Sequence, residues 1–246
     1  MDSYNVFAPF YDRFQSVDYA ARASYFDEII RAEGAERGLL LDFACGTGTL
    51  SVELSKLGYD VIGTDASEQM LMIAQQKAFD AGEHILFLCQ RMQDLDLYGT
   101  VTACVCALDS LNHLTDEKDL CKAIAKVSLF LEPGGVFVFD MNTPYKHECL
   151  LGDNCYVYED DGSMCVWQNE TEEGMTTIAL DFFTRQKNGL YRRSSEEFCE
   201  RAYSEKTVCR ICRENGLNVT RVYADDSFDA PCDTSQRYIF VAVKGE

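Results

Sequence analysis

The residues best suited to chemistry are two glycines and a carboxylate in the first third of the chain. Gly46 and Gly48 directly follow the apolar run 39–44, and Asp65 comes 19 residues after Gly46, at the end of the next apolar run. A glycine turn between a strand and a helix directs backbone N–H groups towards a ligand. An acid at the end of the second strand can accept hydrogen bonds from both hydroxyls of a ribose. The pattern therefore predicts a nucleoside-containing ligand, although such a turn also has a purely structural interpretation.

Asp42 makes this prediction more specific. It lies inside the apolar run, where a carboxylate is costly unless a cation or several donors satisfy it. The simplest such cation is one carried by the ligand. NAD would place a pyrophosphate at this turn and gain nothing from a carboxylate, and Ser51 replaces the third glycine of the dinucleotide fingerprint. An NAD-dependent oxidoreductase is thus the weakest alternative.

The segment 42–48 resembles motif I of the class I S-adenosylmethionine-dependent methyltransferases, which has an acid, two residues and then Cys-Gly-Thr-Gly. Four further segments also resemble this family. Residues 61–67 resemble the ribose-binding strand, and residues 87–95 resemble the adenine segment. Residues 131–135 resemble the turn before the fifth strand, and residues 5–12 resemble the N-terminal segment that covers the cofactor in the small-molecule branch. The resemblance covers nearly the whole chain. It implies S-adenosylmethionine as the cofactor and a small molecule as the methyl acceptor.

Carried over residue by residue, the resemblance also implies contacts to the cofactor. Asp42 would lie near the methionine amino group, Gly46 and Gly48 under the methionine and ribose, and Asp65 on the ribose hydroxyls. The remaining contacts that the resemblance implies are Tyr11, Cys45, Thr47, Ala66, Met70, Met92 and Ala107.

The adenine contacts depart from the pattern of the family at one position. Met70 would pack against the adenine, and the backbone of Met92 would contact a ring nitrogen. Many relatives carry an acid just before the latter position to accept from the exocyclic amine, whereas this chain has Arg91. Asp94 is a possible substitute acceptor.

Methyl transfer from a sulfonium is an in-line displacement, for which alignment of donor and acceptor supplies most of the acceleration. A base is needed only if the acceptor carries a proton that must leave. The run 108–113 should face the methyl group, so Asp109 or His113 could take that proton, with Asp140 as an alternative. Equally, Asp109 could be a turn residue and His113 a helix-start or core histidine.

Contacts to the acceptor are expected from residues after the fourth strand and from an inserted segment. The candidates are Tyr4, Asn112, Trp167, Arg201 and Tyr203, although any single aromatic residue is more often part of a core. No metal site is expected, because Cys209 and Cys212 lack a second pair of ligands at zinc spacing.

The elements that must position these residues alternate between strand and helix, which predicts a Rossmann-like, doubly wound parallel sheet of the seven-stranded methyltransferase type. Strands are expected at 39–44, 61–64, 85–89, 101–108, 136–139, 218–223 and 237–243, and helices at 19–31, 50–57, 67–81, 115–131 and 204–215. Four further strands, joined by Asp-Gly, Glu-Gly and Asn-Gly turns, are expected at 156–159, 164–172, 176–187 and 190–201. The predicted organisation is a cofactor-binding domain of residues 1–144 and 204–246, with an antiparallel β insertion of residues 145–203 acting as a lid over the acceptor pocket.

Composition narrows the function further. The 246 residues include 22 Lys and Arg against 41 Asp and Glu, a formal charge of −19 that disfavours nucleic acid and anionic membranes as partners. No apolar run is long enough to span a bilayer, and the first residues lack the character of a secretory signal, so a cytoplasmic location is expected. The twelve cysteines are scattered singly, as buried free thiols would be. An RNA methyltransferase and a non-catalytic module that binds S-adenosylmethionine remain as alternatives, and the oligomeric state is not readable.

Overall fold

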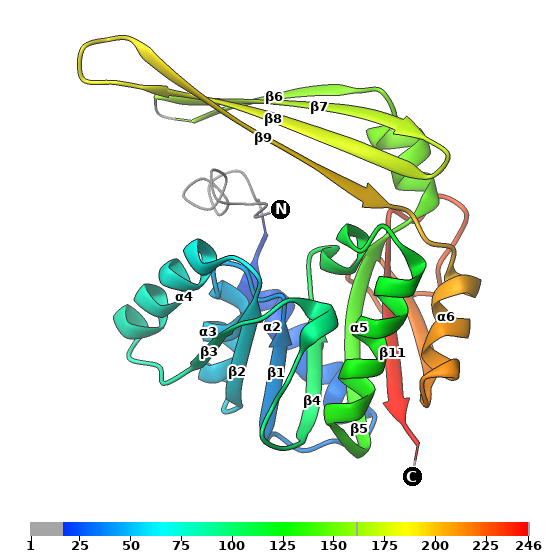
Figure 1. Cartoon of the computed structure of the whole chain (residues 1–246). Helices are drawn as coiled ribbons and strands as arrows, with labels where there is room; N and C mark the ends of the chain where they lie inside the picture. The colour runs from blue at the N-terminus through cyan, green and yellow to red at the C-terminus, as the bar shows by residue number, and fades with distance from the viewer. Residues whose placement is uncertain (1–16, 161, 246) are drawn as a thin grey trace.

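The computed structural model describes residues 17–160 and 162–245, which contain two sheets (Figure 1). The larger sheet has seven strands in the order β10–β11–β5–β4–β1–β2–β3. The pairs formed by β1 to β5 are parallel, whereas β11 runs antiparallel to both of its neighbours. These strands are β1 (Leu39–Phe43), β2 (Asp60–Asp65), β3 (Leu86–Cys89), β4 (Val101–Cys106), β5 (Leu131–Asn142), β10 (Leu217–Ala224) and β11 (Arg237–Lys244).

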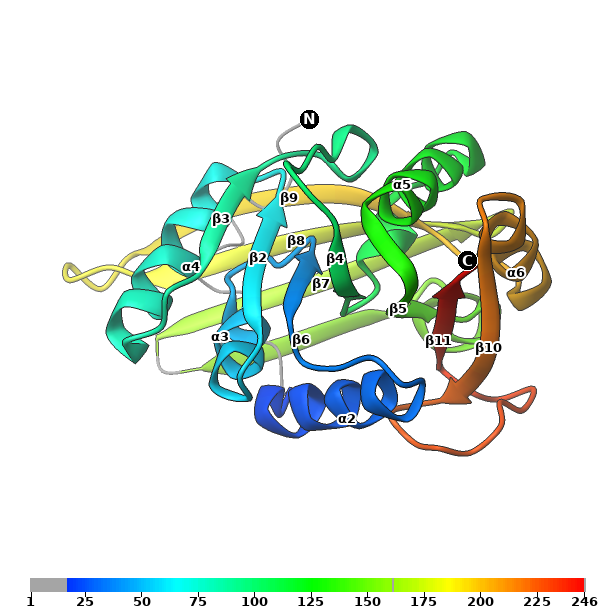
Figure 2. The same cartoon turned by 90° about the horizontal axis from the view of Figure 1, so that it is seen from below.

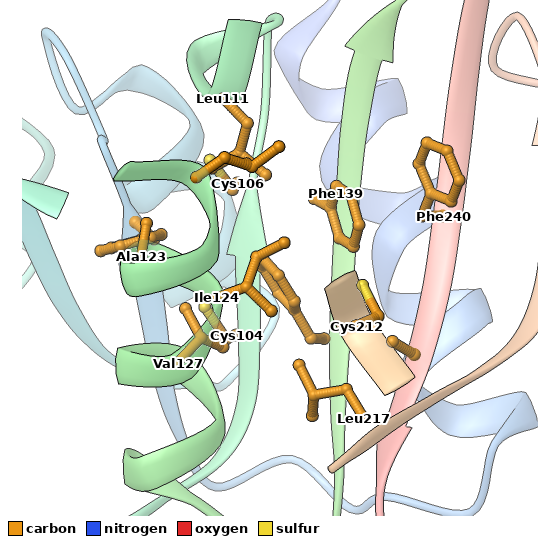
Figure 3. Packing of buried hydrophobic residues seen from close by; sticks show 14 of the residues in the cluster. Cys104, Cys106, Leu111, Ala123, Ile124, Val127, Phe139, Cys212, Leu217 and Phe240 are labelled. Atoms are coloured by element: carbon orange, nitrogen blue, oxygen red, sulfur yellow. The ribbon is translucent and has the colours of Figure 1, made fainter. Parts of the chain in front are cut away.

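Helices cover both faces of this sheet (Figure 2). On one face lie α2 (Tyr19–Ala32) and α3 (Thr49–Lys56), with α4 (Glu68–Ala81) next to α3; on the other lie α5 (Glu117–Phe130) and α6 (Glu205–Glu214). Each face has its own core, because every central strand carries apolar side chains on both sides. In the core under α5, Ile124 and Val127 face Phe139 and Phe240 (Figure 3). The doubly wound fold predicted from the alternating pattern is confirmed.

The cysteines divide between core and surface. Cys104 and Cys106 of β4 and Cys212 of α6 pack in the core on the α5 and α6 face of the larger sheet (Figure 3), and Cys165 is buried in the second sheet. These four behave as the small hydrophobic residues that were expected. The expectation is wrong for the five cysteines that lie exposed, which are Cys89, Cys149, Cys155, Cys199 and Cys232.

Local signals place the helix ends where the sequence predicted them, with one exception. Ser67 accepts from the N–H of Met70 at the start of α4, and Gly82 ends that helix with a left-handed φ of 73°. Leu131, expected as the last apolar residue of a helix, instead begins β5 and pairs with Val101. Its burial serves the same core, so the apolar period alone could not separate the two structures.

The second sheet is antiparallel and lies beyond the carboxyl ends of the parallel strands (Figure 1). It consists of β6 (Cys155–Asp160), β7 (Ser163–Glu172), β8 (Met175–Arg185) and β9 (Tyr191–Arg201), and the π-helix η3 (Lys146–Leu151) leads into it from β5. The turn between β7 and β8 has positive φ at both Glu173 and Gly174, as a tight hairpin of this hand requires. Phe198 of β9 contacts His113, which follows β4, so one face of this sheet is directed at the parallel strand ends.

The strand order reverses between β1 and β4. From β1 the chain proceeds to β2 and β3 on one side, and then returns to place β4 and β5 on the other. At such a switch point the loops after the two central strands separate, and ligands bind in the crevice outside the carboxyl ends. The loop after β1 and the short helix η2 (Ser110–His113) after β4 flank this point, and η1 (Met92–Asp94) follows β3.

Candidate functional site

The loop after β1 is held in a conformation that depends on glycine. Ala44, Gly46 and Gly48 have φ values of 61°, 54° and 71°, and Gly48 is the N-cap of α3. A Cβ atom on Gly48 would lie 2.6 Å from the Cβ of Ala74, whereas one on Gly46 would meet no atom of the described residues within 4 Å. Gly48 therefore permits close packing of the loop on α4, and the described part of the chain leaves space beside Gly46 that a ligand can approach.

Asp65, at the end of β2, ties this loop to the next one. Its carboxylate accepts from the N–H of Gly46 at 2.9 Å and from the N–H of Ser67 at 2.8 Å. Burial raises its pKa, and the backbone donors work against that shift. Each oxygen retains acceptor capacity beyond these bonds, as recognition of a diol requires.

Asp42 is a buried carboxylate in β1, only 1% exposed. The Ser51 hydroxyl donates to it, and within the part of the chain that the structure describes it has no ion-pair partner. Burial raises the pKa of Asp42 to about 7; the charge of Asp65 adds to the shift and the Ser51 hydrogen bond opposes it. A carboxyl held in this way gains from a cation brought by a ligand, so the residues present fit a ligand with an ammonium group here.

The other predicted cofactor residues lie at or near the carboxyl ends of the same strands. Thr47 is almost fully buried and accepts from the Lys77 ammonium of α4 at 2.8 Å, and Lys77 also donates to Thr49 at 2.6 Å. Met70 is buried in the first turn of α4. The remaining ones lie at the loop after β1, after β2, in η1 and directly after β4: Cys45, Ala66, Met92 and Ala107. Tyr11 lies outside the described residues. We call Asp42, residues 44–48 and Asp65 the glycine-turn cluster.

At the end of β4 a different arrangement is found, in which charged side chains bind one another. Asp109 has a left-handed φ of 55° and its carboxylate accepts from Arg237 at 2.7 Å. Arg237 also pairs with the buried Asp140 at 2.9 Å, and Arg22 of α2 pairs with the same carboxylate at 2.6 Å. Burial alone would raise the pKa of Asp109, but the charges of Arg237 and Lys146 hold it at about 2. Asp109 is therefore ionised at neutral pH and is an anchor for its neighbours.

A second set of titratable groups lies beside Asp109, where β9 ends near the carboxyl ends of the parallel strands. The carboxyl of Glu200, which is 4% exposed, lies 3.6 Å from Nε2 of His113 and 3.7 Å from Nε2 of His147. Burial raises the pKa of Glu200 to about 8, and the negative charge of Asp109 contributes. Burial lowers the pKa of both histidines, that of His147 to about 4. We call Asp109, His113, His147 and Glu200 the histidine–glutamate cluster.

Several predicted acceptor contacts are used within the fold. The amide of Asn112 donates to the carbonyls of Arg201 and Asn142 and accepts from the Asn142 N–H, which fixes η2 to β5 and β9. Arg201 donates to the Thr115 carbonyl, and the buried Tyr203 donates to the Leu114 carbonyl. These side chains brace the junction between the two sheets.

The other two predicted acceptor contacts have different positions. Trp167 in β7 pairs with Leu180, on the sheet face that carries Phe198 and Glu200, so it lies on the face directed at the parallel strand ends. Tyr4 lies outside the described residues.

The sequence did not reveal the groups that complete the histidine–glutamate cluster, nor the arginines of the neighbouring charge network. Glu200 and His147 come from β9 and η3, and Arg22 and Arg237 from α2 and β11. Nothing in the spacing of these residues signals that they meet. Strand alternation places Glu200 on the same face as Phe198, but the sequence does not say which face is directed inward.

Comparison with known proteins agrees with this geometry. Residues 40–135 match the model of a methyltransferase domain family. A protein of Bacillus subtilis strain 168 named as a methyltransferase is 31% identical over 245 residues, which cover 99% of this chain and 98% of that protein. The crystal structure of an S-adenosylmethionine-dependent methyltransferase from Clostridium acetobutylicum ATCC 824 superposes with a TM-score of 0.91, at 31% identity and 99% coverage of both chains.

A relative of narrower coverage carries a more specific name. The dTDP-3-amino-3,4,6-trideoxy-alpha-D-glucopyranose N,N-dimethyltransferase of Streptomyces venezuelae is 36% identical over 136 residues, covering 54% of this chain and 56% of that protein. Among the described residues, no helix is both long and apolar enough to cross a membrane.

Proposed function

The chain belongs to the S-adenosylmethionine-dependent methyltransferases, and from this premise we propose that it transfers the methyl group to a small-molecule acceptor. The observation that carries the proposal is the position of the two clusters. The glycine-turn cluster lies after β1 and β2, the histidine–glutamate cluster lies after β4, and the strands β1 and β4 are neighbours at the switch point. Donor and acceptor can thus meet between them.

In this proposal the glycine-turn cluster holds the cofactor, which supplies a methyl group on a sulfonium when it is bound. Asp65 accepts from the ribose hydroxyls, and Asp42 faces the ammonium of the methionine part. The backbone at Gly46 and Gly48 supports the part of the cofactor that joins the ribose to the ammonium group. Five further residues line the same crevice, with Met70 and Met92 on the adenine: Cys45, Thr47, Ala66, Met70 and Met92. Ala107 lies on the opposite side, after β4.

Residues 145–203 act in this proposal as a cap on the acceptor pocket. The four-stranded sheet presents Trp167 and Phe198 on the face directed at the parallel strand ends. Apolar and aromatic side chains of this kind cover a small ligand and exclude water. The name of the Streptomyces venezuelae relative, with a nucleotide-linked amino sugar as acceptor, supports a small molecule over a macromolecule.

His113 is the base of the proposed reaction where the acceptor has a proton to lose. Burial lowers its pKa, so the ring is uncharged and able to accept a proton at neutral pH. Asp109, held in its ionised form by Arg237, opposes that shift and stabilises the imidazolium once it forms.

Thermal unfolding with saturating S-adenosylhomocysteine, and in parallel with NAD, tests the cofactor part of the proposal. A ligand at 100 times its dissociation constant adds about 2.7 kcal/mol, which corresponds to a rise of about 5–11 °C in a chain of this length. We expect this rise with S-adenosylhomocysteine alone. A rise with NAD alone, or with neither ligand, would contradict the proposal.

Transfer itself is tested with S-adenosylmethionine labelled in the methyl group and a panel of metabolites. Labelled low-molecular-weight product is the expected result. Label that appears only in added RNA would make the chain an RNA methyltransferase, and tight cofactor binding without product across all metabolite classes would make it a sensor of S-adenosylmethionine.

A further inference from the structure

Three groups in the histidine–glutamate cluster converge on one point. One ligating atom each from Asp109, His113 and Glu200 lie within 4.8 Å of one another. Asp109 follows the end of β4, His113 lies in η2, and Glu200 is the last residue but one of β9. All three atoms can accept a hydrogen bond, the imidazole nitrogen when it is unprotonated. Such a convergence favours a group that donates in three directions.

Glu200 is poorly supplied with donors for a buried carboxyl. Among the described residues its hydrogen bond is a long one, 3.4 Å from the amide nitrogen of Asn142. The two imidazole nitrogens face its two oxygens from beyond hydrogen-bond distance, at 3.6 and 3.7 Å. One of them, Nε2 of His147, is itself fully buried and has no hydrogen-bond partner in the described part of the chain. Both observations show buried polar atoms that a ligand could satisfy, and the Glu200 oxygens call for a donor, whereas Nε2 of His147 donates or accepts according to its tautomer.

The cations nearby already have partners. Arg237 binds Asp109 and Asp140, and the Lys146 ammonium donates to the Asn142 side-chain oxygen at 2.8 Å. A divalent metal at the convergence point would have to share the Asp109 carboxylate with the guanidinium of Arg237, and would lie close to two fixed positive charges. An organic cation with a single positive charge and directed N–H donors fits this environment better than a divalent metal does.

We propose that the methyl acceptor is a small amine, which binds through its ammonium group to Asp109, His113 and Glu200. This inference rests on the proposed function and names its acceptor class. A tetrahedral nitrogen with N···acceptor distances of about 2.8 Å has its acceptors roughly 4.6 Å apart, which falls inside the 4.8 Å limit within which the three atoms lie. An alcohol offers a single donor and would leave two of the three atoms without one.

The cluster also supplies the proton acceptor that an amine needs before it can be methylated. Uncharged His113 takes one N–H proton of the bound ammonium, which leaves a lone pair on the nitrogen and an imidazolium between the carboxylates of Asp109 and Glu200. The lone pair forms the new N–C bond as the S–C bond breaks, and the electron pair of that bond remains on sulfur. The product is the N-methylated ammonium, a thioether and a proton held by His113.

The charges around Glu200 agree with this use. Asp109 faces it from the end of β4, His113 from η2, Lys146 and His147 from η3, and Arg237 from β11. Burial and the charge of Asp109 raise the pKa of Glu200 to about 8, so the carboxyl holds a proton at pH 7 when no ligand is bound. A bound ammonium reverses that balance, and amine binding should therefore release a proton from Glu200.

Matched amine and alcohol probes test the proposal. Wild type, Glu200→Gln and the control Glu197→Gln, an exposed glutamate on the opposite face of β9, are saturated with S-adenosylhomocysteine. Ligand-observed NMR titrations then measure the affinity for benzylamine against benzyl alcohol and for cyclohexylamine against cyclohexanol. We expect wild type and Glu197→Gln to prefer the amine at least 10-fold, as the loss of one charge-assisted hydrogen bond implies, and Glu200→Gln to lose that preference.

Each other outcome overturns the proposal. Equal or absent binding of amine and alcohol to wild type does so, and so does a preference that survives Glu200→Gln. Calorimetry with Zn²⁺ and Mg²⁺ on chelator-treated protein is the companion measurement, because binding that Glu200→Gln abolishes would make the cluster a metal site. Calorimetric titration with S-adenosylhomocysteine separates a failure of the acceptor class from a failure of the proposed function. If all three proteins bind S-adenosylhomocysteine, a missing preference for the amine overturns the acceptor class alone. If wild type does not bind S-adenosylhomocysteine, the proposed function fails.

Discussion

The two clusters on either side of the switch point are built in different ways. In the glycine-turn cluster, the groups follow one another along the chain, and backbone N–H groups and left-handed turns do most of the positioning. In the histidine–glutamate cluster, side chains from η2, η3 and β9 meet beside a charge network that reaches α2 and β11. The first is determined by local sequence, and the second by the tertiary fold.

The two kinds of construction suit different tasks. A cofactor common to many enzymes can be held by a conformation that a short motif encodes. An acceptor pocket needs side chains at fixed positions, and these positions exist only after the whole fold has formed. The two clusters should therefore respond differently to substitution: the first through ligand affinity, the second through stability and acceptor choice.

The largest effect is expected from Arg237→Met, which removes one member of the buried charge network and leaves Asp140 and Asp109 with less compensation. Breaking a buried pair in this way costs about 3–5 kcal/mol, or a fall of about 6–20 °C in the unfolding midpoint. Differential scanning calorimetry measures it, with Arg221→Met at an exposed position of β10 as control. A midpoint within 2 °C of wild type would show that the network does not hold the second cluster together.

Asp65→Ala should act on affinity. It removes two charge-assisted hydrogen bonds to the ribose in the proposed complex, and we expect about 100-fold weaker binding of S-adenosylhomocysteine in calorimetry. The matched control is Asp60→Ala, at the exposed first residue of the same strand. Unchanged affinity in Asp65→Ala would refute the ribose assignment and with it the contrast between the two clusters.

The pH dependence of the free energy of unfolding should distinguish the two clusters in the absence of a methyl acceptor. The raised pKa of Glu200, about 8, means that the folded chain keeps a proton which the unfolded chain releases above about pH 4.5. This group therefore favours folding at low pH, and its contribution is lost as the pH rises from about 4.5 to about 8. The raised pKa of Asp42 likewise favours folding at low pH, and this contribution is lost as the pH rises from about 4 to about 7.

Urea unfolding at pH 5, 6.5 and 8 measures this dependence. We expect Glu200→Gln to flatten the fall of stability up to pH 8, whereas Asp42→Asn flattens the part below pH 7. Saturation with S-adenosylhomocysteine should remove the contribution of Asp42, by pairing it with an ammonium, and leave that of Glu200. Identical pH slopes in all three chains would show that neither carboxyl is held as the structure indicates.

The smallest effect is expected from Lys77→Met. Lys77 fixes the glycine turn from α4 through Thr47 and Thr49, but it does not reach Asp42 or Asp65 through any bond described above. Losing a partly buried hydrogen-bond pair should weaken S-adenosylhomocysteine binding about fivefold. Lys56→Met, at the end of α3, is the control. An effect as large as that of Asp65→Ala would mean that side chains, rather than the backbone, position this turn.

The same contrast explains what the sequence could predict. The apolar runs, the capping residues Ser67 and Ser204 and the hairpin dipeptides located nearly every element, and motif I located the glycine turn. The partners of Asp109 could not be found in this way, since Arg237 is 128 residues away and nothing local links the two. Asn112 and Tyr203 were expected at the acceptor, yet their polar atoms bind backbone groups, which only the folded chain reveals.

The most direct test of the account is a crystal structure of the chain with S-adenosylhomocysteine. The account predicts the ribose hydroxyls within hydrogen-bond distance of Asp65, the amino group beside Asp42, and the sulfur directed across the switch point towards Asp109 and His113. A nucleoside bound elsewhere on the molecule would contradict it, and so would a sulfur directed away from the end of β4.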